Sequence, residues 1–149
     1  MLHCKNALLE TGGDIEKAIE MLRRRGLATA RKRGARAAGE GVIEAYVHHN
    51  GKLGALVELN CETDFVARTD EFKRLAYDLA MQVAATSPQY ISDGEIPVDA
   101  ALDPQEVCLL LQPSIKEPSQ SVGEVITATI AKTGENIRVA RFARFELGS

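Results

Sequence analysis

The strongest constraint on the fold is a β-hairpin signal in the middle of the chain. Asn50-Gly51 is a residue pair that two-residue hairpin turns prefer, because both turn positions need a positive φ. Residues 42–49, before the turn, are rich in β-prone side chains. After the turn, apolar residues occupy every second position, and the positions between them are mixed: Leu53, Ala55, Val57 and Leu59. We therefore predict two antiparallel strands in a sheet that is covered mainly on one side.

A long amphipathic helix is predicted soon after this hairpin. Thr69 or Asp70 is a suitable N-cap, and Ser87-Pro88 ends the helical pattern. The apolar residues recur at spacings of three, four, seven and eleven from the first: Phe72, Leu75, Ala76, Leu79 and Val83. Such spacing puts them on one helix face, which the apolar face of the sheet can cover.

The last third of the chain predicts a second helix and a closing strand. Residues 88–120 contain all five prolines and little periodicity, apart from an apolar run at 107–111 that suits a buried strand or a helical turn. Ser121 and Glu124 form a capping box for a helix that Gly134 ends. Residues 137–145 then read as a strand. The fold class is α+β, with an antiparallel sheet in a core domain at residues 42–149.

The first 41 residues predict a separate small unit and a linker. Asp14 can cap a helix that runs to Gly26, and a shorter helix precedes it, which together give a small helical piece at residues 1–26. Residues 27–41 are rich in Ala, Gly and basic residues and read as a linker. Residues 23–36 hold seven of the eighteen Lys and Arg and no acid. Because no aromatic residue is interleaved for base stacking, a solvated linker is favoured over a nucleic-acid patch.

No catalytic, metal or cofactor site is predicted. The chain lacks phosphate-binding glycine loops and a nucleophile elbow. The neighbours His48 and His49 are expected to point to opposite faces of a strand, so they would not share a metal ion. The chain has three isolated cysteines, no apolar run long enough for a membrane span and no leader pattern. These features indicate a protein of a reducing compartment. We expect no enzyme, no cofactor and no specific nucleic acid.

One segment between the hairpin and the long helix stands out. Residues 63–66, Thr-Asp-Phe-Val, place an aromatic and an aliphatic residue after a polar corner, where side chains often project outward. Phe65, however, lies seven residues before Phe72, so both would face the core if one helix were unbroken. From the pattern alone we predict that Phe65 is a core residue.

The segment Cys61-Glu62-Thr63-Asp64-Phe65-Val66-Ala67 resembles the signature of the elongation factor Ts family. Three further stretches are similar to this family in the same order: residues 1–26, residues 39–43 and residues 112–147. The resemblance implies a ubiquitin-associated-like fold for residues 1–26 that begins at the second of its usual three helices. It also implies that the connection at residues 97–107 is shorter than in many relatives.

By this resemblance the chain would be a guanine nucleotide exchange factor for the GTPase elongation factor Tu. Phe65 would insert between helices of the nucleotide domain, with Asp64 in polar contact beside it and Thr63 and Val66 holding the loop. The insertion would disturb the GTPase's site for Mg²⁺ and the GDP phosphates. Met1 and Leu2 match a hydrophobic pair that touches the GTPase in relatives. The implied location is the bacterial cytoplasm, or an organelle matrix or stroma.

Two other functions stay open at this point. A scaffold would bind the GTPase without speeding GDP release, and a basic adaptor would bind RNA through residues 23–36 with a steep salt dependence. The oligomeric state is also open, with a monomer and a homodimer both compatible with the sequence.

Overall fold

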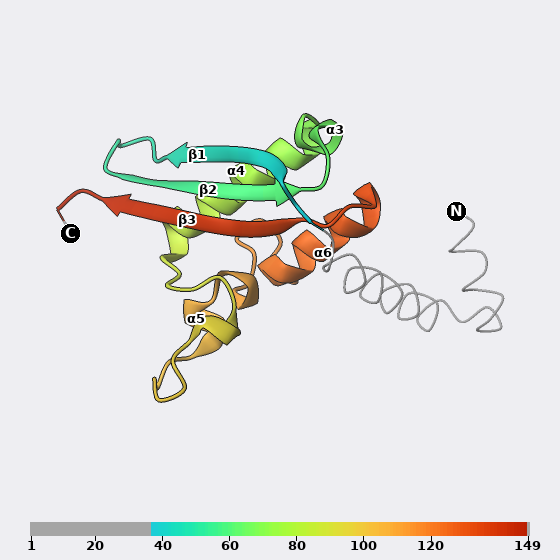
Figure 1. Ribbon diagram of the computed structural model, residues 1–149. Coiled ribbons are helices and arrows are strands. Elements are labelled where there is room, and N and C mark those ends of the chain that lie inside the picture. Colours follow the sequence, from blue (N-terminus) through green and yellow to red (C-terminus); the bar gives the residue numbers. More distant parts are fainter. Residues whose placement is uncertain (1–36, 149) are drawn as a thin grey trace.

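The computed structural model describes residues 37–148 (Figure 1). The expected helical piece at residues 1–26, most of the linker and the basic run at residues 23–36 lie outside the described residues. The described part is an α+β unit, in which a three-stranded antiparallel sheet is packed against helices. Its order of elements is the predicted one, with two strands, a long helix, a second helix and a closing strand.

The sheet is formed by β1 (Glu40–Val47), β2 (Leu53–Cys61) and β3 (Arg138–Glu146), with β2 in the centre. The hairpin at Asn50-Gly51 is confirmed, but the two-residue turn is not, because β1 ends at Val47 and β2 begins only at Leu53. Of the two predicted turn residues, only Gly51 has a positive φ, of 71°. β1 begins two residues earlier than predicted and contains Gly41, whose φ is 152°. A Cβ atom on Gly41 would lie 2.2 Å from the carbonyl oxygen of Leu59, so only glycine allows β1 and β2 to pair this closely.

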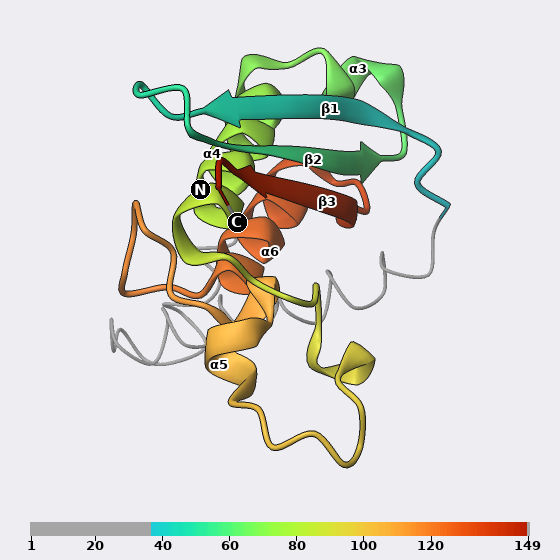
Figure 2. The ribbon, with the colours of Figure 1, turned by 90° about the vertical axis from the view of Figure 1, so that its left-hand side faces the viewer.

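Two helices cover the same face of the sheet, as Figures 1 and 2 show. α4 (Asp70–Thr86) has Thr69 as its N-cap, and Ser87 ends it in the left-handed conformation. α6 (Val122–Thr133) begins with the predicted capping box at Ser121 and ends at Gly134, whose φ is 79°. Both helices were predicted because their end signals are local in the sequence.

The hydrophobic core lies between this sheet face and α4. Phe72 of α4 is the largest of its fully buried side chains, with 0% exposure, and Val57 and Leu59 of β2 are equally enclosed. α6 and β3 close the core with buried aliphatic residues. The other core residues from these elements, and from the link between α6 and β3, include Leu75, Ala76, Leu79, Ala80, Val83, Ile126, Ile130, Ile137 and Val139. The predicted apolar stripe of the long helix is therefore the face that packs on the sheet.

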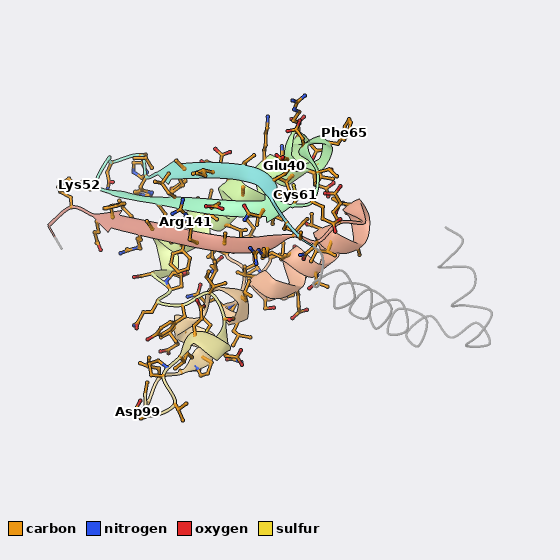
Figure 3. All side chains as sticks on the ribbon, viewed as in Figure 1. Glu40, Lys52, Cys61, Phe65, Asp99 and Arg141 are labelled. Atoms are coloured by element: carbon orange, nitrogen blue, oxygen red, sulfur yellow. The ribbon has the colours of Figure 1, made fainter. Side chains whose placement is uncertain are left out.

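The connection between α4 and α6 extends away from the sheet, with Asp99 near its tip (Figure 3). It contains η1 (Asp93–Glu95), α5 (Pro104–Val107) and η2 (Leu109–Leu111). The apolar run at 107–111 forms helical turns, one of the two predicted alternatives, and Leu109 is fully buried. The Gln82 side chain of α4 anchors the return of the chain, because its oxygen accepts the backbone N–H of Ile115 at 3.0 Å.

Among residues 37–148, no helix combines the length and apolar character needed to cross a bilayer.

Substitution of Phe72 should test the central packing of this unit. We expect Phe72→Ala to lower the free energy of unfolding by about 3–5 kcal/mol, because it removes an enclosed ring and leaves a cavity. Urea unfolding followed by far-UV circular dichroism measures the change. A loss below about 1 kcal/mol, which is typical of half-exposed sites, would contradict this account of the core.

Candidate functional site

A two-helix corner joins the central strand to the long helix. α3 (Asp64–Ala67) is a single turn that is separated from β2 by Glu62 and Thr63 and from α4 by Arg68 and Thr69. We call residues 62–69 the Phe65 corner. It lies at one end of the sheet, and Figure 3 shows Phe65 pointing away from the body of the molecule.

Phe65 is 87% exposed, which makes it one of the most exposed large apolar side chains in the described part of the chain. Our pattern-based interpretation of Phe65 as a core residue is therefore wrong. The spacing of seven from Phe72 assumed one continuous helix, but the helix is broken at Arg68 and Thr69. The break turns α3 relative to α4, and Phe65 no longer shares the face that carries Phe72.

The other side of α3 is attached to the core. Ala67 is buried and Val66 packs against the core cluster. Thr69 ties the two helices together, because its hydroxyl donates to the carbonyl of Val66 at 2.7 Å and accepts the backbone N–H of Phe72 at 3.2 Å. The corner therefore presents Phe65 from an anchored turn, whereas an exposed aromatic on a loose loop would sample many positions.

Thr63 caps α3 in the manner typical of helix N-termini. Its backbone is extended, and its hydroxyl oxygen accepts the backbone N–H of Val66 at 3.4 Å. Asp64 follows in the first turn and forms an ion pair with Arg68 at 2.8 Å. Both charged groups are more than half exposed, so the pair adds little to stability and leaves polar groups available beside Phe65.

Glu135 holds the corner from a distant part of the chain. One carboxylate oxygen, Oε1, accepts the backbone N–H groups of Glu62 at 3.1 Å and Thr63 at 2.9 Å. The other, Oε2, accepts the hydroxyl of Thr63 at 2.5 Å. Glu135 follows Gly134 at the end of α6, 72 residues from Thr63. Sequence reasoning assigned Glu135 no role, since no local pattern links positions so far apart.

Cys61 lies under the corner and is a structural residue. Its side chain is fully buried, and the thiol donates to the carbonyl oxygen of Thr63 at 3.1 Å. Burial raises the pKa of the Cys61 thiol to about 11, and the nearby Glu135 carboxylate adds to this increase. The thiol is therefore neutral near pH 7 and is a poor nucleophile.

Of the six predicted site residues, four lie together at the corner: Thr63, Asp64, Phe65 and Val66. Met1 and Leu2 lie outside the described residues. The structure also corrects the expectation for the histidine pair. His48 and His49 follow the end of β1, and their ring centroids are 4.1 Å apart, so they contact each other instead of pointing to opposite faces.

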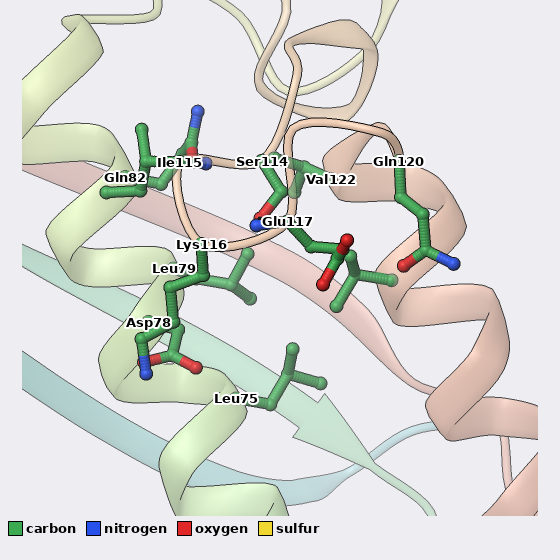
Figure 4. Close-up of a pocket in the computed structure, with 11 residues that line it drawn as sticks. Leu75, Asp78, Leu79, Gln82, Ser114, Ile115, Lys116, Glu117, Gln120 and Val122 are labelled. Carbon is green, nitrogen blue, oxygen red and sulfur yellow. Dashed lines mark hydrogen bonds and ion pairs between the residues drawn. The ribbon is translucent and has the colours of Figure 1, made fainter.

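A hollow of about 220 Å³ lies between α4, the loop at residues 114–120 and the start of α6 (Figure 4). Leu75, Leu79 and Val122 contribute to its apolar part. Lys116 forms an ion pair with Asp78 at 2.9 Å beside it. These groups serve mainly to hold the loop on α4, and the arrangement contains no nucleophile paired with a base.

Replacement of the exposed ring should leave the fold intact. We expect Phe65→Ala to change the free energy of unfolding by less than about 0.5 kcal/mol, because the ring has few contacts to lose. The same urea titration used for Phe72→Ala provides the comparison. A loss above about 2 kcal/mol would mean that Phe65 supports the core after all.

Comparison with known proteins places this geometry in a family. A family model described as elongation factor TS matches residues 27–104. Elongation factor Ts of Carboxydothermus hydrogenoformans is 48% identical, over 99% of this chain and 82% of the relative. Elongation factor Ts of Heliobacterium modesticaldum is 46% identical over 99% and 83%, and that of Thermotoga neapolitana is 47% identical over 99% and 89%. The chain therefore belongs to the elongation factor Ts family.

Proposed function

We propose that Phe65 is the side chain with which this chain loosens GDP from elongation factor Tu. As a member of the elongation factor Ts family, the chain is a guanine nucleotide exchange factor for that GTPase in translation elongation. Exchange requires no covalent step from the factor. It requires a surface that binds the GTPase better when the nucleotide is absent.

The observation that carries the proposal is an 87% exposed phenylalanine on an anchored helical turn. An aromatic ring held away from its own core exposes apolar area to water, and this area is recovered when a partner encloses it. The anchored backbone reduces the entropy that binding would otherwise lose. We propose that the ring enters between helices of the nucleotide domain and disturbs the site of Mg²⁺ and the GDP phosphates.

The neighbours of Phe65 suit supporting roles. We assign polar contacts with the GTPase to Asp64, whose pair with Arg68 is exposed and exchangeable. We assign Thr63 and Val66 to holding the turn, in line with the helix cap and the packing of Val66 on the core. We propose a separate contact through Met1 and Leu2, as the resemblance implies.

Energy considerations show that the ring cannot act alone. Weakening GDP binding ten-thousandfold requires about 5.5 kcal/mol of coupling. Burial of one phenylalanine supplies roughly 1.5–3 kcal/mol. The remainder must come from a wider interface, of about 800 Å² per partner if it has the usual size. We therefore place the Phe65 corner within a larger contact surface.

Loss of the ring should slow nucleotide release. We expect Phe65→Ala to reduce the stimulation of GDP release by about 10- to 100-fold, which corresponds to the burial energy of one phenylalanine. Stopped-flow fluorescence of a labelled GDP bound to elongation factor Tu, mixed with catalytic amounts of the full chain, measures the effect.

Val98→Ala provides the matched control, because Val98 is fully exposed on the connection near Asp99 and lies outside the corner. Stimulation by Phe65→Ala equal to that by Val98→Ala would refute the wedge role. Binding of the wild-type chain without faster release would instead identify a scaffold. RNA binding that weakens steeply with salt would favour the adaptor.

We also infer that a second copy of this chain covers the outer face of the sheet. The four large apolar side chains on this face are between 44% and 69% exposed: Ile43, Val47, Leu56 and Phe145. Glu58 and Arg141 form an ion pair at 2.8 Å on the same face. After a two-fold rotation, each of these charges could meet its opposite on the other copy, which suits a self-complementary interface.

A charge in the centre of this face should prevent self-association. We expect wild-type chain at micromolar concentration to sediment as a dimer, and Leu56→Glu to sediment as a monomer, because a buried unpaired carboxylate is costly. Val98→Glu makes the same change of charge on the distant connection and should leave the dimer intact. A wild-type chain that sediments as a monomer at all concentrations would contradict the dimer.

As a translation factor, the chain is proposed to act in the bacterial cytoplasm or in an organelle that translates.

A further inference from the structure

We propose that Glu135 is a positioning residue for nucleotide exchange. Its carboxylate would not touch elongation factor Tu, but would fix the backbone from which Phe65 projects. This inference rests on the proposed role of Phe65.

The first argument is the number and kind of bonds that one carboxylate makes. Glu135 accepts two consecutive backbone N–H groups with Oε1 and the Thr63 hydroxyl with Oε2. An ionised carboxylate only accepts hydrogen bonds and can accept several at once. Bonds to a charged acceptor are about twice as strong as neutral ones. Glu135 is therefore a strong anchor for the strand end that leads into α3.

The second argument is the double duty of the Thr63 hydroxyl. It donates its proton to Glu135 and accepts the backbone N–H of Val66 as the N-cap of α3. Donation to Glu135 fixes the orientation of the hydroxyl, so that a lone pair can face Val66. A helix of one turn is not stable by itself and depends on such anchors. The direction of Phe65, inside this turn, is thereby tied to Glu135.

The third argument is the rigidity of the segment that carries Glu135. Gly134 ends α6 in the left-handed conformation, and the backbone N–H of Glu135 donates to the Thr133 hydroxyl at 3.3 Å. On the other side, Asn136 and Ile137 are buried. α6 itself is held in the core by Ile126 and Ile130. Through Glu135, the well-packed helix α6 therefore restrains the Phe65 corner, which follows the C-terminal end of β2.

These contacts predict what happens when the carboxylate is removed. The backbone N–H groups of Glu62 and Thr63 would donate to water instead. The Thr63 hydroxyl, which caps α3, would no longer be held in one orientation. Phe65 would then sample more orientations, and binding would have to order the turn again. We expect Glu135→Ala to reduce stimulation of GDP release by about tenfold.

Glu95→Ala is the matched control. Its Oε2 also accepts two backbone N–H groups, from Ile91 at 2.7 Å and Ser92 at 2.8 Å, but in the connection between α4 and α6. The substitution Glu95→Ala therefore removes a carboxylate that accepts two backbone N–H groups, as Glu135→Ala does, but leaves the Phe65 corner unchanged. We expect its stimulation to stay within about twofold of the wild type, and its thermal unfolding to be shifted by an amount similar to that of Glu135→Ala.

A double-mutant cycle with Phe65→Ala separates a positioning role from a general structural one. If Glu135 acts through the ring, Glu135→Ala should slow release by less than about twofold further when Phe65 is already alanine. An equal loss in both backgrounds would overturn the inference. If Glu135→Ala fails to fold, Glu135→Gln is used. Glutamine has the same length but only one acceptor oxygen, so it cannot accept hydrogen bonds from both the backbone N–H groups and the Thr63 hydroxyl as the carboxylate does.

The chain has no tryptophan, so Phe65→Trp places a single reporter at the corner. We expect the steady-state anisotropy of this tryptophan to fall when Glu135→Ala is added and to be unchanged with Glu95→Ala. Unchanged anisotropy and wild-type exchange in Glu135→Ala, with slow exchange in Phe65→Ala, would refute the inference and leave the proposed function intact. Wild-type exchange in Phe65→Ala would refute the wedge role and this inference together.

Discussion

Packing of α4 against one face of the sheet is the interaction on which the rest of the structure depends. Phe72, near the start of α4, is fully enclosed by that packing, so the start of the helix has a fixed place. β2 ends in the core at Cys61, which has a fixed place for the same reason. Between these two fixed points the chain has room for one helical turn, and Phe65 is exposed on it. The site is thus a consequence of core packing at both of its ends.

An exposed aromatic ring lowers the stability of the fold little when the backbone around it is held by other contacts. The backbone of the Phe65 corner is held by Ala67 in the core, by Thr69 between the helices and by Glu135, which lies just after α6. None of these contacts involves the ring of Phe65, so its surface stays accessible to a partner. This separation allows a stable core and an exposed aromatic ring to coexist in one small unit.

Local signals made much of the fold predictable. The hairpin signal at Asn50-Gly51, the Thr69 cap and the capping box at Ser121 each act within a few residues. The structure confirms the hairpin and both caps, although the hairpin loop is longer than the two-residue turn that was predicted. Phe65 was misplaced because the helical period was carried across the break at Arg68 and Thr69. Glu135 was missed because its contact with Thr63 spans 72 residues and is made only by the tertiary fold.

The central claim is that Phe65 couples the binding of this chain to the loss of GDP. Coupling between two ligands of one protein is reciprocal, so it can be measured without following exchange at all. The measurement is the ratio of Kd values of the chain for elongation factor Tu with GDP bound and without nucleotide, by titration calorimetry. We predict that Phe65→Ala lowers this ratio by about tenfold or more. An unchanged ratio would contradict the account, even if both affinities fell together.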